Sequence, residues 1–270
     1  MLDVNGRQVE VRAAKGVVLA SGGIAHDIER RSRAYSHRAG NGEHVSLAAP
    51  GNTGDGARMA ESAGGYVDSE VSNGGAWMPI SKVPRPDGTW GPILHSVNQG
   101  KPGMIAVMRD GRRFSDESVS YHDLVENMIR RSADDAPAGA FILCDDRAFR
   151  KYGLGYAKPF LPVGKLIRSG YLRRDATLRG LATQIGVDPQ SLETTVADYN
   201  RHAAMGRDPE FGKGESPYGR FLGDVDAAGN PNIAPLDRAP YYAVWMYAGD
   251  IGNFAGIRTD ENARVLRRDG

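Results

Sequence analysis

The sequence predicts an α/β protein in two parts, on three observations. Residues 16–20 form a short, wholly apolar run, which is typical of a strand buried on both faces of a sheet. A glycine-rich loop at 51–56 precedes a helical pattern. Apolar residues then recur at helical spacing in 121–131 and 177–185. The apolar run and the glycine-rich loop indicate an α/β domain early in the chain, and the later helical patterns belong to a second part.

The first 72 residues carry the α/β signals. Residues 9–12 alternate like a strand, and Asn5-Gly6 before them reads as a hairpin turn. The run 16–20 predicts a strand of a parallel or mixed sheet, and it ends at Ser21-Gly22-Gly23. A helix is predicted over 27–37. A second, short helix follows the loop 51–56, where a glycine-rich turn would leave free backbone N–H groups at the helix start.

From about residue 73 the character of the sequence changes. Tryptophan, proline and glycine crowd residues 73–92, which predicts an irregular stretch. Beyond it we expect three helices, at 121–131, at 177–185 and after the Asp188-Pro189 cap. Expected strands lie at 104–108, with Asp110-Gly111 as its turn, and at 141–144, 241–246 and 263–266.

Composition excludes several functional classes. Lys and Arg number 34 against 33 Asp and Glu, so the net charge of +1 argues against a nucleic-acid-binding protein. No apolar run is long enough to span a membrane and no signal peptide is evident, so we expect a cytoplasmic protein. The one cysteine, Cys144, fits a reducing compartment. The six histidines lack metal-ligand spacing, so we expect no metal site.

Taken in order, several segments resemble one family of flavoproteins. They are the strand and Gly-Gly turn at 15–23, the T-G-D-G loop at 53–57, the runs at 101–107 and 111–121, the segment 208–214, and the runs at 240–243, 249–252 and 256–260. Together they resemble the 3-ketosteroid Δ1-dehydrogenases of the fumarate reductase flavoprotein superfamily. Two departures are Asp116, where the family has Asn, and residues 253–255, where it has T-x-G.

The resemblance implies FAD as the cofactor and an α/β fold made of part of an FAD-binding domain plus an inserted α+β capping, catalytic domain of the fumarate reductase flavoprotein type. It implies boundaries at 1–72 and 238–270 for the FAD-binding part and at 73–237 for the cap. The implied cofactor contacts are Ala20, Ser21, Gly22, Gly23, Thr53, Gly54, Asp55 and Gly56. For any one of these glycines, ordinary turn chemistry is the rival interpretation.

The resemblance also implies that Tyr121 is the catalytic base, which takes a proton from the carbon beside a ketone while the flavin takes a hydride from the adjacent carbon. The alternative is a tyrosine that only packs at a helix start. Glu117 is expected to orient Tyr121 and the pair Arg112-Arg113, or else to form a surface ion pair. Trp77 and Phe254 are candidates for lining the substrate pocket.

In the family, the FAD fingerprint lies upstream of these segments and a ketone-holding run lies downstream. We therefore expect this chain to be an internal fragment that does not retain FAD and is inactive alone. Expected partners are a small apolar ketone such as a 3-ketosteroid, an external electron acceptor and, through exposed sheet edges, a second copy in a homodimer. The alternatives are a fumarate reductase-like enzyme with another substrate, which Tyr121 in place of an arginine disfavours, and a non-catalytic fragment with a binding role.

Overall fold

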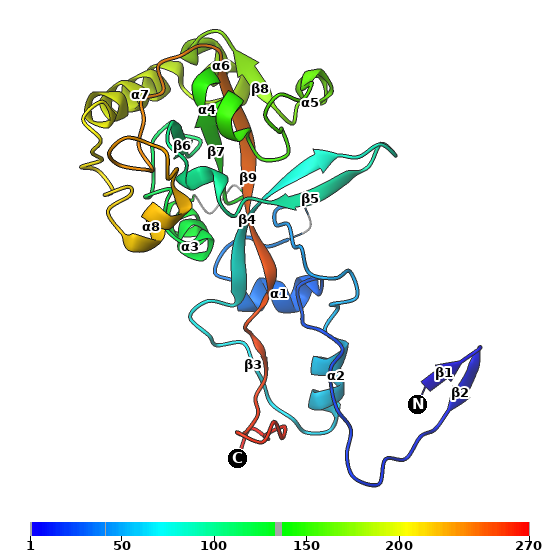
Figure 1. The fold of residues 1–270 in the computed structure, drawn as a ribbon. Helices are drawn as coiled ribbons and strands as arrows, with labels where there is room; N and C mark the ends of the chain where they lie inside the picture. Colours follow the sequence, from blue (N-terminus) through cyan, green and yellow to red (C-terminus); the bar gives the residue numbers. More distant parts are fainter. Residues whose placement is uncertain (1, 41, 133–136, 270) are drawn as a thin grey trace.

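The computed structural model describes residues 2–40, 42–132 and 137–269. A six-stranded antiparallel sheet forms its centre, in the order β5-β4-β9-β7-β6, with β8 also paired to β9. Figure 1 shows β9 running from the helical region at one end of the molecule to the C-terminal segment at the other. The strands of this sheet are β4 (Gly75–Pro84), β5 (Trp90–Leu94), β6 (Met104–Val107), β7 (Gly139–Cys144), β8 (Arg173–Asp175) and β9 (Tyr241–Asn253).

Three predicted strands of this sheet are confirmed. Residues 104–107, 139–144 and 241–253 pair side by side, and the register sets Phe141 opposite Trp245. Every residue of β7 is buried, which explains its unbroken apolar sequence. The predicted turn after β6 is also present, since Met108 donates its N–H to the Arg112 carbonyl and Gly111 takes a φ of +77°.

The predicted helices form where capping residues start them. Asp27, Ser120, Thr177 and Asp188 each accept a hydrogen bond from a backbone N–H in the first turn that follows. The helices are α1 (Ile28–Ala34), α2 (Asp55–Ser62), α3 (Tyr121–Arg131), α4 (Asp146–Tyr152), α5 (Gly164–Arg168), α6 (Leu178–Ile185), α7 (Pro189–Ala203) and α8 (Pro217–Leu222), with a short 3-10 turn η1 (Asn98–Gly100). The helix predicted over 27–37 ends three residues early, because Tyr35 is extended.

Apolar side chains cover both faces of the sheet. One face packs against α3 and α4 through a cluster that includes Leu124, Met128 and Phe149. The opposite face packs against α6 and α7 through a second cluster that includes Leu181 and Leu192. The sheet is therefore the middle layer of the helix-rich part of the molecule.

The prediction of an irregular stretch over 73–92 is wrong. These residues form most of the hairpin of β4 and β5, with Ile80 opposite Leu94 and Pro84 opposite Trp90. Prolines usually exclude a central strand, but here Pro79 lies opposite Ala248 of β9 and Pro92 lies on the edge strand β5. The proline content hid the strand from sequence reasoning.

Two other predicted strands are wrong. Residues 16–20 are not a strand: no neighbouring strand of the described residues pairs with them, and Val18 is 90% exposed. A strand is stabilised by hydrogen bonds from its N–H and C=O groups to a neighbouring strand, and this apolar run has no such neighbour among the described residues. The expected parallel or mixed sheet is accordingly absent from the described residues. Residues 263–266 make only an isolated bridge, between Val265 and Thr259.

The remaining short strands lie outside the central sheet. At the start of the chain, β1 (Leu2–Val4) and β2 (Arg7–Val9) form a hairpin, with positive φ at both Asn5 and Gly6 as the predicted turn requires. The strand predicted over 9–12 ends at Val9. Near the other terminus, β10 (Gly256–Ile257) pairs with β3 (Val67–Asp68) beside α2. No helix among the described residues has the length and apolarity that a membrane crossing needs.

Candidate functional site

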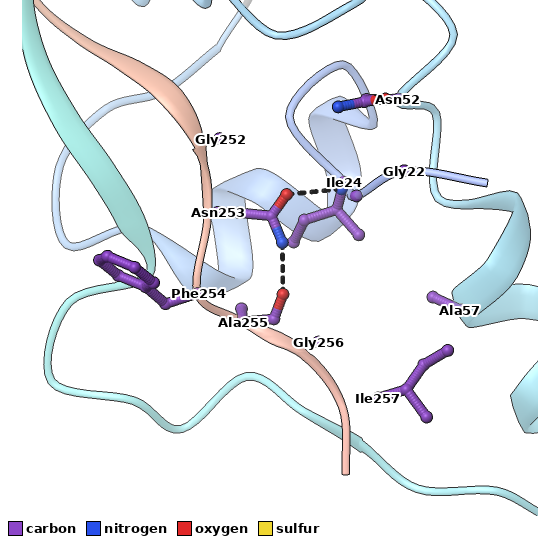
Figure 2. A pocket seen from close by; sticks show the side chains of 11 residues that line it. Gly22, Ile24, Asn52, Ala57, Gly252, Asn253, Phe254, Ala255, Gly256 and Ile257 are labelled. Atoms are coloured by element: carbon purple, nitrogen blue, oxygen red, sulfur yellow. Dashed lines mark hydrogen bonds between the residues drawn. The ribbon is translucent and has the colours of Figure 1, made fainter. Parts of the chain in front are cut away.

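A cavity of about 420 Å³ lies where the early glycine turn meets the end of β9. Its walls come from three parts of the chain that are distant in sequence: residues 22–24, the start of α2 with the loop before it, and residues 252–257. Figure 2 shows the Asn253 side chain between the end of β9 and residues 22–24. Its amide donates a hydrogen bond to the carbonyl of Ala255 and accepts one from the backbone N–H of Ile24. The Ile24–Asn253 hydrogen bond measures 2.9 Å.

Two glycines let the backbone approach closely at this cavity. A Cβ added to Gly22 would lie 2.1 Å from Oδ1 of Asn52, and one added to Gly23 would lie 2.0 Å from Oδ1 of Asn253. Gly22 also has a φ of +84°, a conformation that other residues rarely adopt. Of the predicted cofactor residues, Gly22 and Gly23 therefore line the cavity, and a side chain at either position would displace its wall.

The other predicted cofactor residues surround the start of α2. Gly54 takes a φ of +80° as the N-cap and donates its N–H to the Gly23 carbonyl at 3.0 Å, so the two glycine turns are joined. No side chain caps α2, which leaves backbone N–H groups and the positive end of the helix dipole at this point. A Cβ at Gly56 would lie 2.8 Å from Oγ of Ser21.

The remaining members of that prediction lie at the edge of this arrangement. The Asp55 carboxylate pairs with Arg58 at 2.5 Å and accepts from the Thr53 hydroxyl at 3.4 Å. Ala20 and Ser21 are exposed and do not line the cavity. The structure thus brings the two glycine loops together and leaves the end of the predicted strand outside.

Tyr121 is the first residue of α3, directly after the Ser120 cap. Its half-buried ring packs against the cluster of Val45, Met78 and Ile80. That cluster connects the loop after α1 to the central sheet, so Tyr121 lies at the junction of the two.

The two predicted pocket aromatics lie in different surroundings. Trp77 is fully buried, donates its ring N–H to Asn73 at 3.1 Å and packs edge-on to Tyr35 with ring centroids 4.7 Å apart. Phe254 is 61% exposed and lines the cavity. The His122 ring connects them, with its centroid 6.5 Å from the Trp77 ring and 6.1 Å from Phe254. Trp77 thus belongs to the core beside His122, and Phe254 offers the accessible ring.

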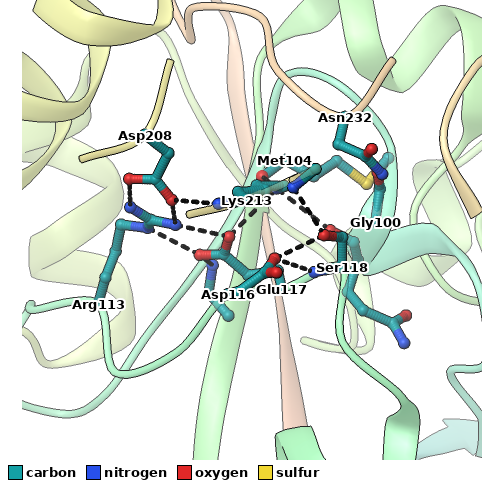
Figure 3. A network of polar contacts seen from close by, with 12 residues as sticks. Gly100, Met104, Arg113, Asp116, Glu117, Ser118, Asp208, Lys213 and Asn232 are labelled. Atoms are coloured by element: carbon teal, nitrogen blue, oxygen red, sulfur yellow. Dashed lines mark hydrogen bonds and ion pairs between the residues drawn. The ribbon is translucent and has the colours of Figure 1, made fainter. Parts of the chain in front are cut away.

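A buried ionic network lies upstream of Tyr121. Arg113 donates two hydrogen bonds of 2.8 Å to Glu117 and two more of 2.8 Å to Asp208. The Lys213 ammonium lies 3.2 Å from Glu117. Figure 3 shows these four side chains converging beside Asp116 and Ser118. The alternative of a surface ion pair for Glu117 is wrong, because Glu117 is fully buried.

Charge compensation explains why this network is stable. Burial raises the pKa of Glu117, but the neighbouring Arg113 and Lys213 outweigh burial and hold the pKa at about 2. Burial likewise opposes the charge of Arg113, and its two carboxylate partners raise the pKa above the ordinary value. Glu117 and Arg113 are therefore ionised at neutral pH, and the network holds the segment 113–118 that leads into Tyr121.

Sequence reasoning missed a second buried network around Asp250. Its carboxylate accepts from the Tyr35 hydroxyl at 2.9 Å and from Ser46 at 2.6 Å, and it contacts Nε2 of His44 at 2.7 Å. Burial lowers the pKa of His44, so that imidazole is neutral. The Gly-Asp pair at 249–250 was part of the recognised pattern, but nothing in the sequence showed which side chains it would meet.

Comparisons with known proteins agree with this arrangement. The profile of the family described as FAD binding domain matches residues 1–270. A 4-oxocyclohex-2-ene-1-carboxylate 5-dehydrogenase of Sinomonas cyclohexanicum is 41% identical over 96% of this chain and 44% of that protein. A 3-oxosteroid 1-dehydrogenase of Mycobacterium tuberculosis is 32% identical over 96% of the chain and 46% of that protein.

A solved structure also matches. The crystal structure of a 3-ketosteroid Δ1-dehydrogenase from Sterolibacterium denitrificans, in complex with 1,4-androstadiene-3,17-dione, is similar with a TM-score of 0.89 and 34% identity. The match covers 98% of this chain and 47% of that one. The chain thus spans about half the length of the curated relatives and of the solved structure that it matches.

Proposed function

Because this chain belongs to the FAD-binding-domain family of flavoproteins, we propose that it forms part of a dehydrogenase that introduces a carbon–carbon double bond beside a ring ketone. The observation that carries the proposal is the likeness of nearly the whole chain to a ketosteroid dehydrogenase, with a TM-score of 0.89. The 41% identical relative also carries the name of a dehydrogenase of a six-membered ring with an oxo group.

The glycine cavity fits a cofactor of this kind. Gly22 and Gly23 line it without side chains, their Cβ positions lying against the amides of Asn52 and Asn253, and the uncapped start of α2 offers N–H donors to phosphate or hydroxyl oxygens. We propose that FAD lies against residues 22–24 and the Gly54-Asp55-Gly56 loop. When bound, its flavin ring would accept the hydride that leaves the substrate.

Tyr121 is the base in this proposal. A carbon next to a ketone loses a proton more readily when the enolate oxygen is stabilised, but it still needs a positioned acceptor. Tyr121 supplies the phenolic oxygen at a helix N-terminus, and the buried network at Arg113 and Glu117 fixes the segment before it. Glu117 accepts hydrogen bonds from Arg113 and from the N–H of Ala106. Its role in the proposal is therefore to fix the position of the backbone that leads into Tyr121.

The division of the chain follows from the same proposal. Residues 1–72 and 238–270 belong to the FAD-binding part and residues 73–237 to the cap. The substrate is a ketone on an alicyclic ring, and an external acceptor reoxidises the flavin. We also propose that the protein is cytoplasmic and that it pairs with a second copy as a homodimer.

Dye-coupled turnover tests the proposed function. The full-length protein that contains this chain, loaded with flavin, is given 4-oxocyclohexanecarboxylate and, separately, a 3-ketosteroid, and the product is identified by mass spectrometry as two hydrogens lighter. We expect turnover of at least one ketone and none of the corresponding alcohol, which lacks the acidified carbon. Reduction of fumarate without oxidation of either ketone would point instead to the fumarate reductase-like alternative.

A further inference from the structure

A second cavity, of about 270 Å³, lies on the other side of the segment that follows the glycine turn. The segment 24–28 separates it from the glycine cavity, since Ile24 lines one and His26 and Ile28 line the other. Its opposite wall is the hairpin of β4 and β5, which contributes Lys82 and Trp90. This second cavity contains basic side chains and no acidic one.

Arg31 is the buried cation of the second cavity. It is 5% exposed and donates to three backbone carbonyls, those of Ala25, Ala39 and Gly40. A guanidinium has five N–H donors, so two remain. Within the described residues no carboxylate pairs with it. Burial lowers the pKa of Arg31, and Asp250 offsets that effect only in part, so the charge lacks a full counter-ion.

Lys82 is the second cation. It is half-buried on β4, opposite Pro92 of β5, and its ammonium lies 4.9 Å from the centroid of the Tyr247 ring. No carboxylate of the described residues pairs with it either. Asp250, which contributes nothing to the lining, is already occupied by Tyr35, His44 and Ser46. The second cavity therefore presents two uncompensated positive charges.

The second cavity lies beside the cluster of Val45, Met78 and Ile80 against which Tyr121 packs. Val45 lines the cavity and is also part of that cluster. Tyr247 packs against the same cluster, and its ring lies 4.9 Å from the Lys82 ammonium. Resting on the proposed function, we propose that Arg31 and Lys82 bind a carboxylate at the far end of the substrate ring from the ketone. The enzyme's substrate is then a small oxo-alicyclic carboxylic acid, and the neutral steroid is the poorer one.

Binding of a carboxylate probe tests this without turnover. Titration calorimetry measures the Kd of cyclohexanecarboxylate, which has no ketone, for the wild type, Lys82→Met, Lys82→Arg and the control Lys165→Met. Lys165 is exposed on α5, away from the second cavity. We expect Lys82→Met to weaken binding at least tenfold, Lys82→Arg to retain it, and Lys165→Met to match the wild type. Equal affinity for all four proteins would overturn the proposal.

Turnover separates the two proposals. The ratio of kcat/KM for 4-oxocyclohexanecarboxylate to that for neutral 4-methylcyclohexanone should fall at least tenfold in Lys82→Met and stay unchanged in Lys165→Met. If the wild type oxidises neither ketone but still binds cyclohexanecarboxylate, the proposed reaction fails and the carboxylate site stands. If both are oxidised with an unchanged ratio in Lys82→Met, the carboxylate site fails alone. ADP could also displace cyclohexanecarboxylate and bind more weakly to Lys82→Met. That result would assign the two cations to a cofactor phosphate and would overturn the carboxylate site.

Discussion

The guanidinium of Arg113 holds the carboxylate of Glu117 through two hydrogen bonds of 2.8 Å, and both side chains are buried. The pair is four residues apart on a segment without helix, so its geometry comes from partners elsewhere in the chain. Asp208 takes the other side of the guanidinium, and Lys213 the other side of the carboxylate. This arrangement ties the segment before Tyr121 to the loop after α7.

Glu117→Gln should destabilise the protein by about 3–5 kcal/mol, because it leaves two buried cations with too little negative charge. The measurement is the free energy of unfolding by urea at neutral pH. The control is Glu193→Gln, which breaks the exposed pair with Arg179 and should cost less than about 1 kcal/mol. Equal losses of unfolding free energy in the two variants would contradict the buried network.

The same pair predicts an acid-dependent loss of stability. The pKa of Glu117 is about 2 in the folded protein and 4.5 ordinarily. A depressed pKa gives stability that is present above pH 4.5 and lost as the pH falls toward 2. The difference in unfolding free energy between wild type and Glu117→Gln should therefore shrink over that range. A difference that stays constant down to pH 2 would show that Glu117 is not held ionised.

Local signals predicted five of the eight described helices and missed the short helices α4, α5 and α8. Asp27, Thr177 and Asp188 are caps that can be identified from residue type and position, and α3 begins and ends where its apolar pattern does. The strands of the hairpin β4–β5 were missed because proline is normally excluded from paired strands. A proline is tolerated in a strand where no neighbouring strand needs its N–H. The residues close to it in sequence do not show which strand will be its neighbour.

The candidate site was predictable only as separate pieces. The two glycine loops and Tyr121 were identified from the recognised pattern, and the structure joins the loops through the Gly54–Gly23 hydrogen bond. The partners of Asp250 and the pairing of Arg113 with Asp208 join residues about 100 to 200 positions apart. Such contacts depend on the fold. Asn253, a departure from the family pattern, turned out to connect the two walls of the glycine cavity.

Gly22→Ala should weaken flavin binding at least tenfold, which corresponds to about 1.4 kcal/mol. The added Cβ would collide with the Asn52 amide, and the positive φ would be strained. Gly229→Ala is the matched control, because Gly229 has a φ of +82° and open space where a Cβ would go. Flavin fluorescence quenching, measured on the full-length protein that contains this chain, gives the affinities. Equal losses in both variants would attribute the effect to backbone strain and not to the cavity.

The most direct measurement is dye-coupled oxidation of a ring ketone by the full-length protein that contains this chain, as wild type and as Tyr121→Phe, with flavin content matched by absorbance. Loss of a general base predicts a fall in kcat of about 10²–10⁴-fold with the flavin still bound. Tyr218→Phe, a change at an exposed tyrosine of α8, should leave kcat unchanged. If Tyr121→Phe turns over at the wild-type rate, Tyr121 does not take the proton and the proposed chemistry at this site is wrong.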